Sequence, residues 1–232
     1  MSTRIIIAID GPAASGKSST AIRVAERLGL QHVDSGALYR AATAARLREP
    51  GERDADRWVE ADVLAAARRL VRLVPSHRSF LPQLDGQAAD QEIRSGDVTA
   101  RVSAVARMPG VRAWVNEQVK ATATTHSIVV DGRDIGTTVF PEADLKIFLV
   151  ADPWERARRR LRQRLSHEPA EREIAEEVDR LMHRDHRDAQ QSGQASDAVV
   201  LDTTHLTQAE QVDRIVALAN AVTHRGDGTS GP

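Results

Sequence analysis

The sequence predicts an α/β protein in which helices cover both faces of a five-stranded parallel sheet, a three-layer fold. Two observations lead to this prediction. Short apolar runs recur along the chain, most of them closed by an acidic residue, and helical patterns separate the later runs. A helix between two strands returns the chain to the edge where the first strand began, so the strands pair in parallel and the helices cover the sheet. The predicted strands are residues 5–9, 31–33, 127–130, 145–150 and 198–201.

The first strand and the first helix form the start of the core. Residues 5–9 are a continuous β-branched run, which is typical of a strand buried on both faces. Residues 17–28 have helical spacing, and Gly29 is the predicted stop. Ligands of parallel sheets bind beyond the carboxyl ends of the strands, so we expect a site at the edge that follows Asp10.

Residues 41–126 follow a different pattern and predict an α+β insertion between core strands. Helical spacing covers 58–71, and residues 78–84 read as a strand that enters a hairpin turn at Asp85-Gly86. Two further helices are expected around residues 98–105 and 111–119. The insertion is therefore expected to form a second lobe.

The last part of the chain predicts two arginine-rich helices and a closing helix. Asp152 and Pro153 start a helix that carries six arginines between residues 156 and 164, and a second helix follows the break at 167–169. Thr207 and Glu210 form a capping box for the final helix. We expect a core of residues 1–40, 127–152 and 186–225, an insertion of 41–126, a lid of 153–185 and a flexible tail of 226–232.

Composition excludes several classes of protein. The 232 residues include 32 basic and 33 acidic side chains, a net charge of -1, so a polybasic nucleic-acid or membrane binder is not expected. The absence of cysteine excludes disulfides, iron–sulfur clusters and thiolate zinc sites. No apolar run approaches the roughly 20 residues of a membrane span. We expect a cytoplasmic monomer that binds neither nucleic acid nor membrane.

The segment after the first strand fits the phosphate-binding pattern G-x-x-x-x-G-K-[ST]. Backbone N–H groups of such a loop surround phosphate oxygens at a helix N-terminus, and the lysine adds a compact cation. Lys17 is one of only three lysines in a chain with 29 arginines. The predicted ATP-binding residues are Gly11, Pro12, Ala13, Ala14, Ser15, Gly16, Lys17, Ser18 and Ser19.

Three other segments carry candidate chemistry. Asp131 ends a core strand and, with Ser18, is a candidate ligand for Mg²⁺. Arg133 follows two residues later and is a candidate to bind a phosphate. Residues 34–40 follow another strand, although alone they indicate only a helix cap and an arginine. The arginine run of 156–164 is either a solvated face or a mobile helix that closes over a phosphoryl group. The run has no evident acidic partner of equal size, so we expect an anion to order it.

Taken in order, these segments resemble the bacterial cytidylate kinases, a family of nucleoside monophosphate kinases. The similarity spans roughly residues 4–222 and rests on IDGPAASGKSS, DSGALYR, VSAVARMPGVR, DGRDIGTTVFP, KIFL, RDHRD and LDTT. DSGALYR and DGRDIGTTVFP, together with the long insertion, are far more specific to this family than the phosphate loop. The resemblance implies the phosphate-loop (P-loop) fold, an acceptor-binding insertion, a helical lid, and transfer of phosphate from MgATP to CMP and dCMP.

The resemblance also implies roles for individual residues. An acceptor phosphate is anionic near neutral pH, so the reaction needs cations rather than a general base. Lys17, Arg133, Arg184 and the lid's Arg158 are the expected catalytic cations. The expected acceptor-binding residues are Ser35, Arg40, Arg133 and Arg184 for the phosphate, Ser103, Arg112 and Asp134 for the cytosine, and Asp188 for the ribose.

Alternatives remain open at this point. The chain could use another pyrimidine acceptor such as UMP, or it could be a nucleotide-binding P-loop protein that transfers no phosphoryl group. The sequence also departs from the family pattern, because Gln191 stands where an arginine is expected and Pro-Leu does not follow. Arg187 lies four residues earlier, on the same face if the segment is helical, and is a candidate substitute.

Overall fold

The protein is described by a computed structural model that covers residues 4–188 and 192–227, with side chains described up to residue 222. These residues form two compact units. The first unit contains the residues up to 29 and those from 129 onward, and the second contains residues 30–128. Among the described residues, no helix is both long and apolar enough to cross a membrane.

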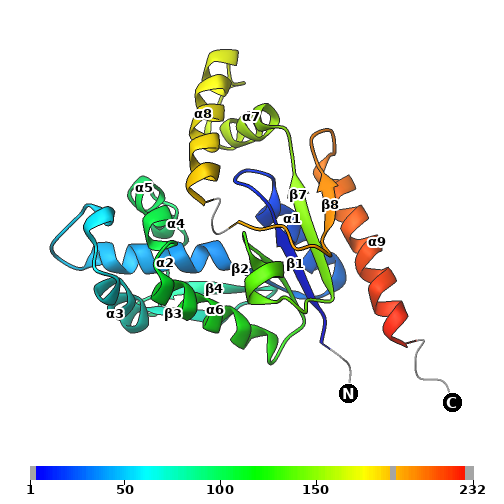
Figure 1. The fold of residues 1–232 in the computed structure, drawn as a ribbon, viewed down its shortest axis with the longest axis horizontal. Coiled ribbons are helices and arrows are strands. Elements are labelled where there is room, and N and C mark those ends of the chain that lie inside the picture. The colour runs from blue at the N-terminus through cyan, green and yellow to red at the C-terminus, as the bar shows by residue number, and fades with distance from the viewer. Residues whose placement is uncertain (1–3, 189–191, 228–232) are drawn as a thin grey trace. The chain divides into compact units, whose positions relative to one another are not determined.

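The sheet of the first unit has the strand order β6-β1-β7-β8. The strands are β1 (Ile6–Asp10), β6 (Ile128–Asp131), β7 (Leu145–Val150) and β8 (Val199–Asp202). β1 pairs in parallel with β7, and β7 pairs in parallel with β8 (Figure 1). Ile7, Ile9 and Leu149 are completely buried, as expected for strands covered on both faces. The predicted α/β fold with a mostly parallel sheet is confirmed.

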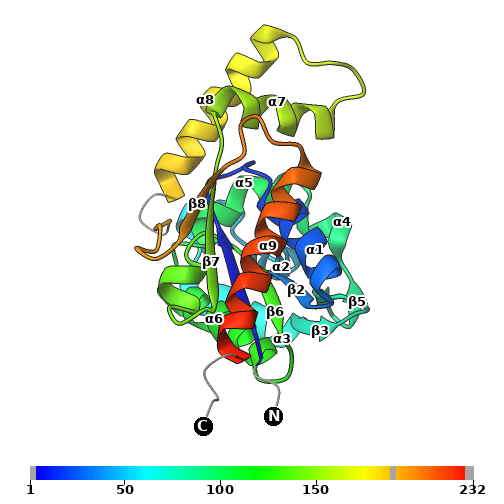
Figure 2. The same ribbon diagram turned by 90° about the vertical axis from the view of Figure 1, so that its right-hand side faces the viewer.

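Helices α1 (Lys17–Leu28) and α9 (Gln208–Asp227) pack against each other beside this sheet (Figure 2). Gly29 ends α1 in a left-handed conformation with a φ of 69°, as predicted. The capping box of α9 is also present, since the Glu210 carboxylate accepts from the Thr207 N–H at 2.8 Å. α9 extends through Asp227, so the predicted tail begins in a helix, and residues 228–232 lie outside the described residues.

Helices α7 (Pro153–Arg164) and α8 (Glu171–Asp188) form a hairpin above the sheet (Figures 1 and 2). The Asp152 carboxylate caps α7 by accepting from the N–H groups of Trp154 and Glu155. The two helices share a small apolar core of Ala157, Leu161, Ile174 and Leu181, which also contains Ala13 of the phosphate loop. The hairpin is therefore packed directly on that loop.

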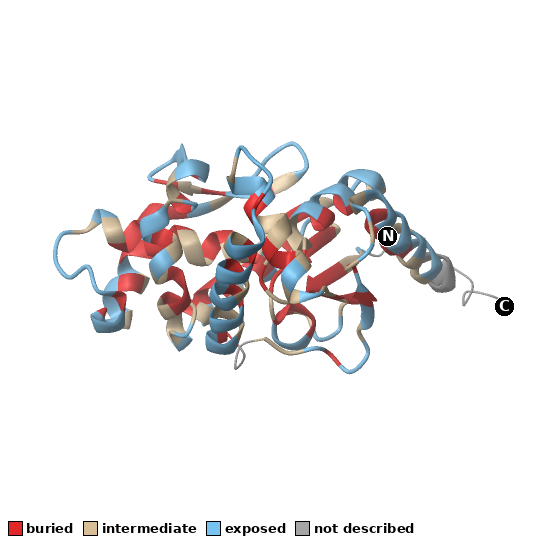
Figure 3. Ribbon diagram, turned by 90° about the horizontal axis from the view of Figure 1, so that it is seen from above, coloured by how far each residue is buried: buried red, intermediate tan, exposed pale blue. Residues whose placement is uncertain are grey.

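The second unit combines four strands with several helices. Its strands are β2 (Gln31–Asp34), β3 (Val71–Pro75), β4 (Ser79–Leu84) and β5 (Gln87–Ala88). β2 pairs in parallel with β4, which pairs antiparallel with β3 and β5. The helices are α2 (Ser35–Arg48), the 3₁₀ turn η1 (Ala55–Arg57), α3 (Glu60–Leu70), α4 (Asp90–Ile93), α5 (Gly96–Val105) and α6 (Pro109–Ala123). In both units the buried residues concentrate on the inner faces of the elements (Figure 3).

Two features of the second unit differ from the sequence-based expectation. The helix predicted over 58–71 ends at Leu70, and β3, which was not predicted, begins at Val71. The apolar spacing runs from the helix into the strand, so periodicity alone does not separate them; pairing with β4 does, with Val71 opposite Leu84. The unit also begins at residue 30, because β2 and α2 pack with elements of the segment predicted as the insertion.

Candidate functional site

The phosphate loop joins β1 to α1, and its two glycines adopt conformations that other residues disfavour. Gly11 has a φ of 148°, and a Cβ there would lie 2.3 Å from the carbonyl oxygen of Leu149. Gly16 has a φ of 92° and directly precedes α1. As the N-cap residue, Gly16 has no side chain to cap the first N–H groups of α1. The start of α1 is therefore arranged to accept an anion.

Lys17 is the first residue of α1 and folds back over the loop. Its Nζ donates a hydrogen bond to the carbonyl oxygen of Pro12 at 2.6 Å. Burial, and then the positive charge of Arg133, lower the pKa of Lys17 to about 8. Asp131 and Asp10 act in the opposite direction and do not offset these effects. A bound anion would favour the charged form of this lysine.

Two carboxylates stand at the ends of the central strands. Asp131, at the end of β6, accepts a hydrogen bond from the Ser18 hydroxyl at 2.5 Å. Asp10, at the end of β1, accepts from the N–H groups of Ile135 and Gly136 at 2.9 and 2.8 Å. Burial raises the pKa of Asp10 to about 6 despite these two bonds. Asp10 therefore fixes the backbone turn that follows Asp134, whereas Asp131 and Ser18 present oxygen atoms beside the loop.

Three of the predicted acceptor residues of the first unit lie together. Arg133 forms an ion pair with Asp188 at 2.9 Å, and Arg184 lies 3.6 Å from the same carboxylate. Burial lowers the pKa of Arg133, although the nearby Asp188 partly opposes this effect. Asp134, the fourth, is buried at the start of a π-helical turn of residues 135–139.

Asp185 and Arg156 connect this cluster to the phosphate loop. The Asp185 carboxylate accepts from the Ala13 N–H at 3.1 Å and from Arg156 Nη1 at 2.6 Å. Arg156 Nη1 also donates to the Ala13 carbonyl oxygen at 2.9 Å, so both polar backbone groups of Ala13 are held by side chains of α7 and α8. Arg133 lies 3.8 Å from Asp185 as well. We call Asp185, Arg156 and Ala13 the loop clamp.

Each arginine of α7 has an acidic partner, which was not expected from the sequence, although the six arginines share only four carboxylates. One carboxylate belongs to α7 itself, one belongs to the following turn, and two belong to α8. Folding alone brings the carboxylates of α8 next to α7. The pairs are Arg156–Asp185, Arg158–Glu155, Arg159–Glu155, Arg160–Glu177, Arg162–Glu168 and Arg164–Glu177. The predicted catalytic Arg158 thus pairs locally with Glu155, and the arginine of α7 that contacts the loop is Arg156.

In the second unit, α2 organises the predicted acceptor residues. Asp34 caps α2 by accepting from the Ala37 N–H at 3.0 Å, and Ser35 is its buried first residue. Arg40 donates to the hydroxyl of Thr99 on α5 at 3.0 Å. Arg112 of α6 places its guanidinium 6.0 Å from the ring of Tyr39.

Ser103, on α5, is also buried. Helices α5 and α6 both contact α2, so the second unit gathers four predicted residues around one helix.

Comparison with known proteins agrees with this geometry. The family model described as cytidylate kinase matches residues 7–221. The chain belongs to the cytidylate kinase family. The cytidylate kinase of Thermus thermophilus is 44% identical over 219 residues, which cover 92% of this chain and 98% of the relative. The cytidylate kinases of Chlorobaculum tepidum and Streptomyces griseus are each 40% identical, with coverage of both chains of 94% and 92%, respectively.

Within this member of the cytidylate kinase family, sequence reasoning missed Asp10, Asp185 and Arg156 as site residues. Asp10 ends a buried strand directly before the phosphate loop, and this position could have identified it as a site residue. No local signal identified the loop clamp, because its two side chains are 29 residues apart on different helices. Arg187 is exposed on α8, and Gln191 lies outside the described residues.

Proposed function

We propose that this protein transfers the γ-phosphoryl group of ATP to CMP and dCMP, giving ADP and the nucleoside diphosphate. The observation that carries this proposal is the group of cations at the phosphate loop, Lys17 with Arg133 and Arg184, in a chain of the cytidylate kinase family. Two approaching phosphates repel each other, and cations reduce that repulsion most strongly where water is excluded. The acceptor phosphate is itself the nucleophile, so no general base is needed.

The donor half of the site follows from the loop geometry. Residues 11–19 would bind the phosphates of ATP through backbone N–H groups and the start of α1. Lys17 would replace its hydrogen bond to Pro12 with one to the transferred phosphoryl group. The side chains of Asp185 and Arg156 hold the backbone of Ala13 and so fix the conformation of this part of the loop. These residues orient the donor for in-line transfer.

The residues beside the loop fit a magnesium ion. The Ser18 hydroxyl donates a 2.5 Å hydrogen bond to the Asp131 carboxylate, so two oxygen ligands lie side by side. Mg²⁺ prefers oxygen ligands together with substrate phosphates. When bound, the ion would neutralise charge on the β- and γ-phosphates. In the described part of the chain no group of three or more acidic or histidine side chains forms a metal cage, which fits a metal held largely by ATP.

The proposed acceptor residues are found in each of the two units. We propose that Arg40, Arg133, Arg184 and Ser35 bind the acceptor phosphate, and that Asp188 contacts the ribose. Ser103, Arg112 and Asp134 would read the cytosine edge, since they offer hydrogen-bond donors and acceptors in buried or half-buried positions. Arg133 and Arg184 now pair with Asp188, so a bound phosphate would compete with a carboxylate for them.

An ADP-release assay with CMP, dCMP, UMP, AMP and GMP tests the proposal. We expect turnover with CMP and dCMP to exceed that with AMP or GMP by at least about 100-fold, because a site that hydrogen-bonds one base rejects others strongly. Faster turnover with UMP than with CMP would show that UMP is the preferred acceptor. ADP release that does not depend on any acceptor would show a nucleotide hydrolase instead.

Arg112→Met tests the assignment of the cytosine-reading residues. Loss of one hydrogen-bonding partner should raise the KM for CMP about tenfold and leave the KM for ATP unchanged. Arg107→Met is the control, since Arg107 is an exposed residue of the same unit that pairs with Asp56. An equal rise in both KM values would remove Arg112 from the acceptor site.

A further inference from the structure

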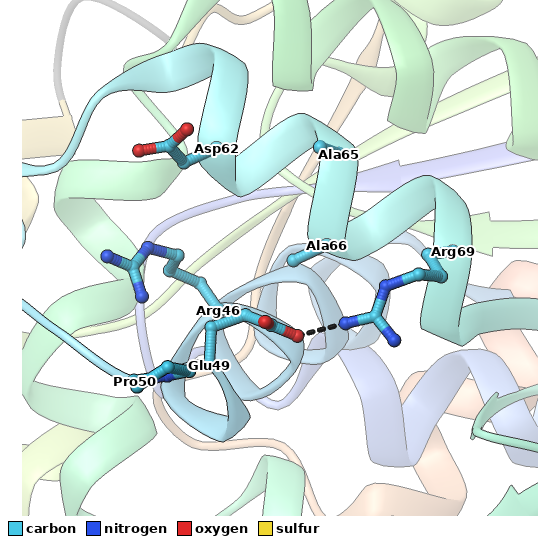
Figure 4. Close-up of a pocket in the computed structure, with 7 residues that line it drawn as sticks. All are labelled: Arg46, Glu49, Pro50, Asp62, Ala65, Ala66 and Arg69. Carbon is cyan, nitrogen blue, oxygen red and sulfur yellow. Dashed lines mark hydrogen bonds and ion pairs between the residues drawn. The ribbon is translucent and has the colours of Figure 1, made fainter.

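A cavity in the second unit lies apart from every residue assigned above to nucleotide binding. It lies between the C-terminal end of α2 and one side of α3, and its volume is about 360 Å³. That volume falls in the range of small-molecule sites and far exceeds the space of one water molecule. Arg46 lines it from α2, Glu49 and Pro50 line it from the segment directly after α2, and Asp62, Ala65, Ala66 and Arg69 line it from α3 (Figure 4).

Arg46 is the unusual residue of this cavity. Its exposed fraction is 7%, and its Nε is buried without a hydrogen-bond partner. It forms no ion pair with a carboxylate of the described residues, and its guanidinium lies 5.4 Å from the centre of the Trp58 ring. A buried cation is costly unless an opposite charge compensates it, and an aromatic ring compensates only in part. Arg46 therefore has unused capacity to bind an anion.

The other charges of the cavity leave this capacity intact. Arg69 is already paired with Glu49, as the dashed contact in Figure 4 shows, so these two charges cancel. Asp62 is exposed at the rim, where water screens its charge. Ala65 and Ala66 provide a small apolar wall. The uncompensated charge inside the cavity is thus the buried cation of Arg46.

We propose that this cavity is a binding site for a small oxyanion, the phosphate or carboxylate group of a small organic molecule, held by Arg46. The guanidinium offers a planar set of N–H donors that matches either group. The apolar wall and the volume leave space for a few carbon atoms beside the charged group. The site would be independent of the phosphate loop, which belongs to the other unit.

Nuclear magnetic resonance of the ¹⁵N-labelled full chain tests this site directly, without reference to activity. The reporters are the Nε–H signal of Arg46 and the indole N–H signal of Trp58, which donates to the Glu52 carbonyl oxygen at 2.8 Å. Inorganic phosphate and sodium acetate are titrated separately, with chloride replaced to keep ionic strength constant. We expect saturable shifts of both reporters with at least one of the two anions, and the stronger binder identifies the preferred headgroup.

A matched pair of variants separates charge from shape. Ala65→Glu places a carboxylate at the cavity wall and should weaken anion binding by at least about tenfold, whereas Ala65→Gln has the same size and should bind as the unmodified chain does. Arg46→Gln should abolish the Trp58 shift, and its thermal unfolding shows whether the fold is retained. Shifts that never saturate with either anion would overturn the proposal. Equal weakening by Ala65→Glu and Ala65→Gln, or saturable binding by a folded Arg46→Gln protein, would also overturn it.

Discussion

The phosphate loop and the α7–α8 hairpin both carry positive charge, but they balance it differently. Lys17 donates to a backbone carbonyl oxygen, and its pKa is lowered to about 8 by burial and by Arg133. Each of the six arginines of α7 has a carboxylate partner instead. The cation of the loop is thus bonded to a backbone carbonyl oxygen, whereas the arginines of the hairpin share four carboxylates.

This difference implies that the loop and the hairpin would bind a phosphate in different ways. The loop is preorganised, since glycine conformations and the loop clamp place its donors before any nucleotide binds. An arginine of the hairpin must first leave its carboxylate, and the buried Glu177 pairs with Arg160, Arg164 and Arg180. We infer that the loop determines binding of the donor, and that the hairpin adds charge only by exchanging partners.

The largest effect is expected at the loop. Lys17→Ala should lower kcat by about 100- to 1000-fold, the usual cost of losing one donor to a developing charge. Lys17→Arg should also be strongly impaired, because the planar guanidinium does not fit a position built for a compact ammonium. Steady-state kinetics measure the loss, and thermal unfolding should show both variants folded. Near-normal turnover of Lys17→Arg would contradict a specific need for lysine.

The next effect concerns the contacts between the phosphate loop and the α7–α8 hairpin. Asp185→Asn removes the charge that pairs with the buried Arg156 and weakens the hold on Ala13. We expect the KM for ATP to rise about tenfold and kcat to change less, because the contact positions the loop that binds ATP and does not touch the transferred phosphoryl group. Asp179→Asn is the control, as Asp179 is an exposed acid of the same helix. Equal changes in both variants would remove Asp185 as a positioning residue.

Hydrogen exchange tests whether the hairpin exchanges its partners. We expect residues 153–185 to gain protection when a bisubstrate analogue binds, because its phosphates can replace carboxylates at Arg156 or Arg158. Glu177→Gln should increase exchange in the free protein, since three arginines lose a buried partner. Protection that is unchanged by the analogue would show that the hairpin keeps its carboxylate partners and does not respond to phosphates.

The lowered pKa of Lys17 predicts proton uptake at alkaline pH. Lysine is partly neutral near pH 8 in the free protein, and bound phosphates raise its pKa, so ATP binding should take up a fraction of a proton at pH 8.5. At pH 6.5 the lysine is already charged and no uptake from it is expected. Calorimetry in buffers of different ionisation enthalpy measures this difference. Uptake that persists in Lys17→Arg at pH 8.5 would assign it to another group.

The smallest expected effect concerns the departure at Gln191. We predict that Arg187, exposed on α8, partly substitutes for the missing arginine. Arg187→Ala should then raise the KM for CMP a few-fold, and adding Gln191→Arg should restore it. A silent Arg187→Ala would end the compensation idea and favour a different acceptor as the reason for the departure.

Much of the loop half of the site could be predicted from the sequence, because its determinants are contiguous. The glycines, Lys17 and Ser18 lie within eight residues, and their conformations follow from local backbone rules. The strand ends could be predicted for the same reason, since an apolar run that stops at an acid marks the edge of a parallel sheet. Asp131 and Ser18 accordingly meet where expected.

Tertiary structure decided the long-range partners of the charged side chains, whereas Arg158 and Arg159 pair with Glu155 of their own helix. Arg156 and Asp185 are 29 residues apart, and Glu177 meets Arg160 only after α7 and α8 pack through their apolar faces. The boundary between α3 and β3 was decided the same way, by pairing with β4 rather than by local preference. Backbone conformation and apolar periodicity are local properties of the chain, whereas ion pairing and strand pairing depend on which segments packing brings together.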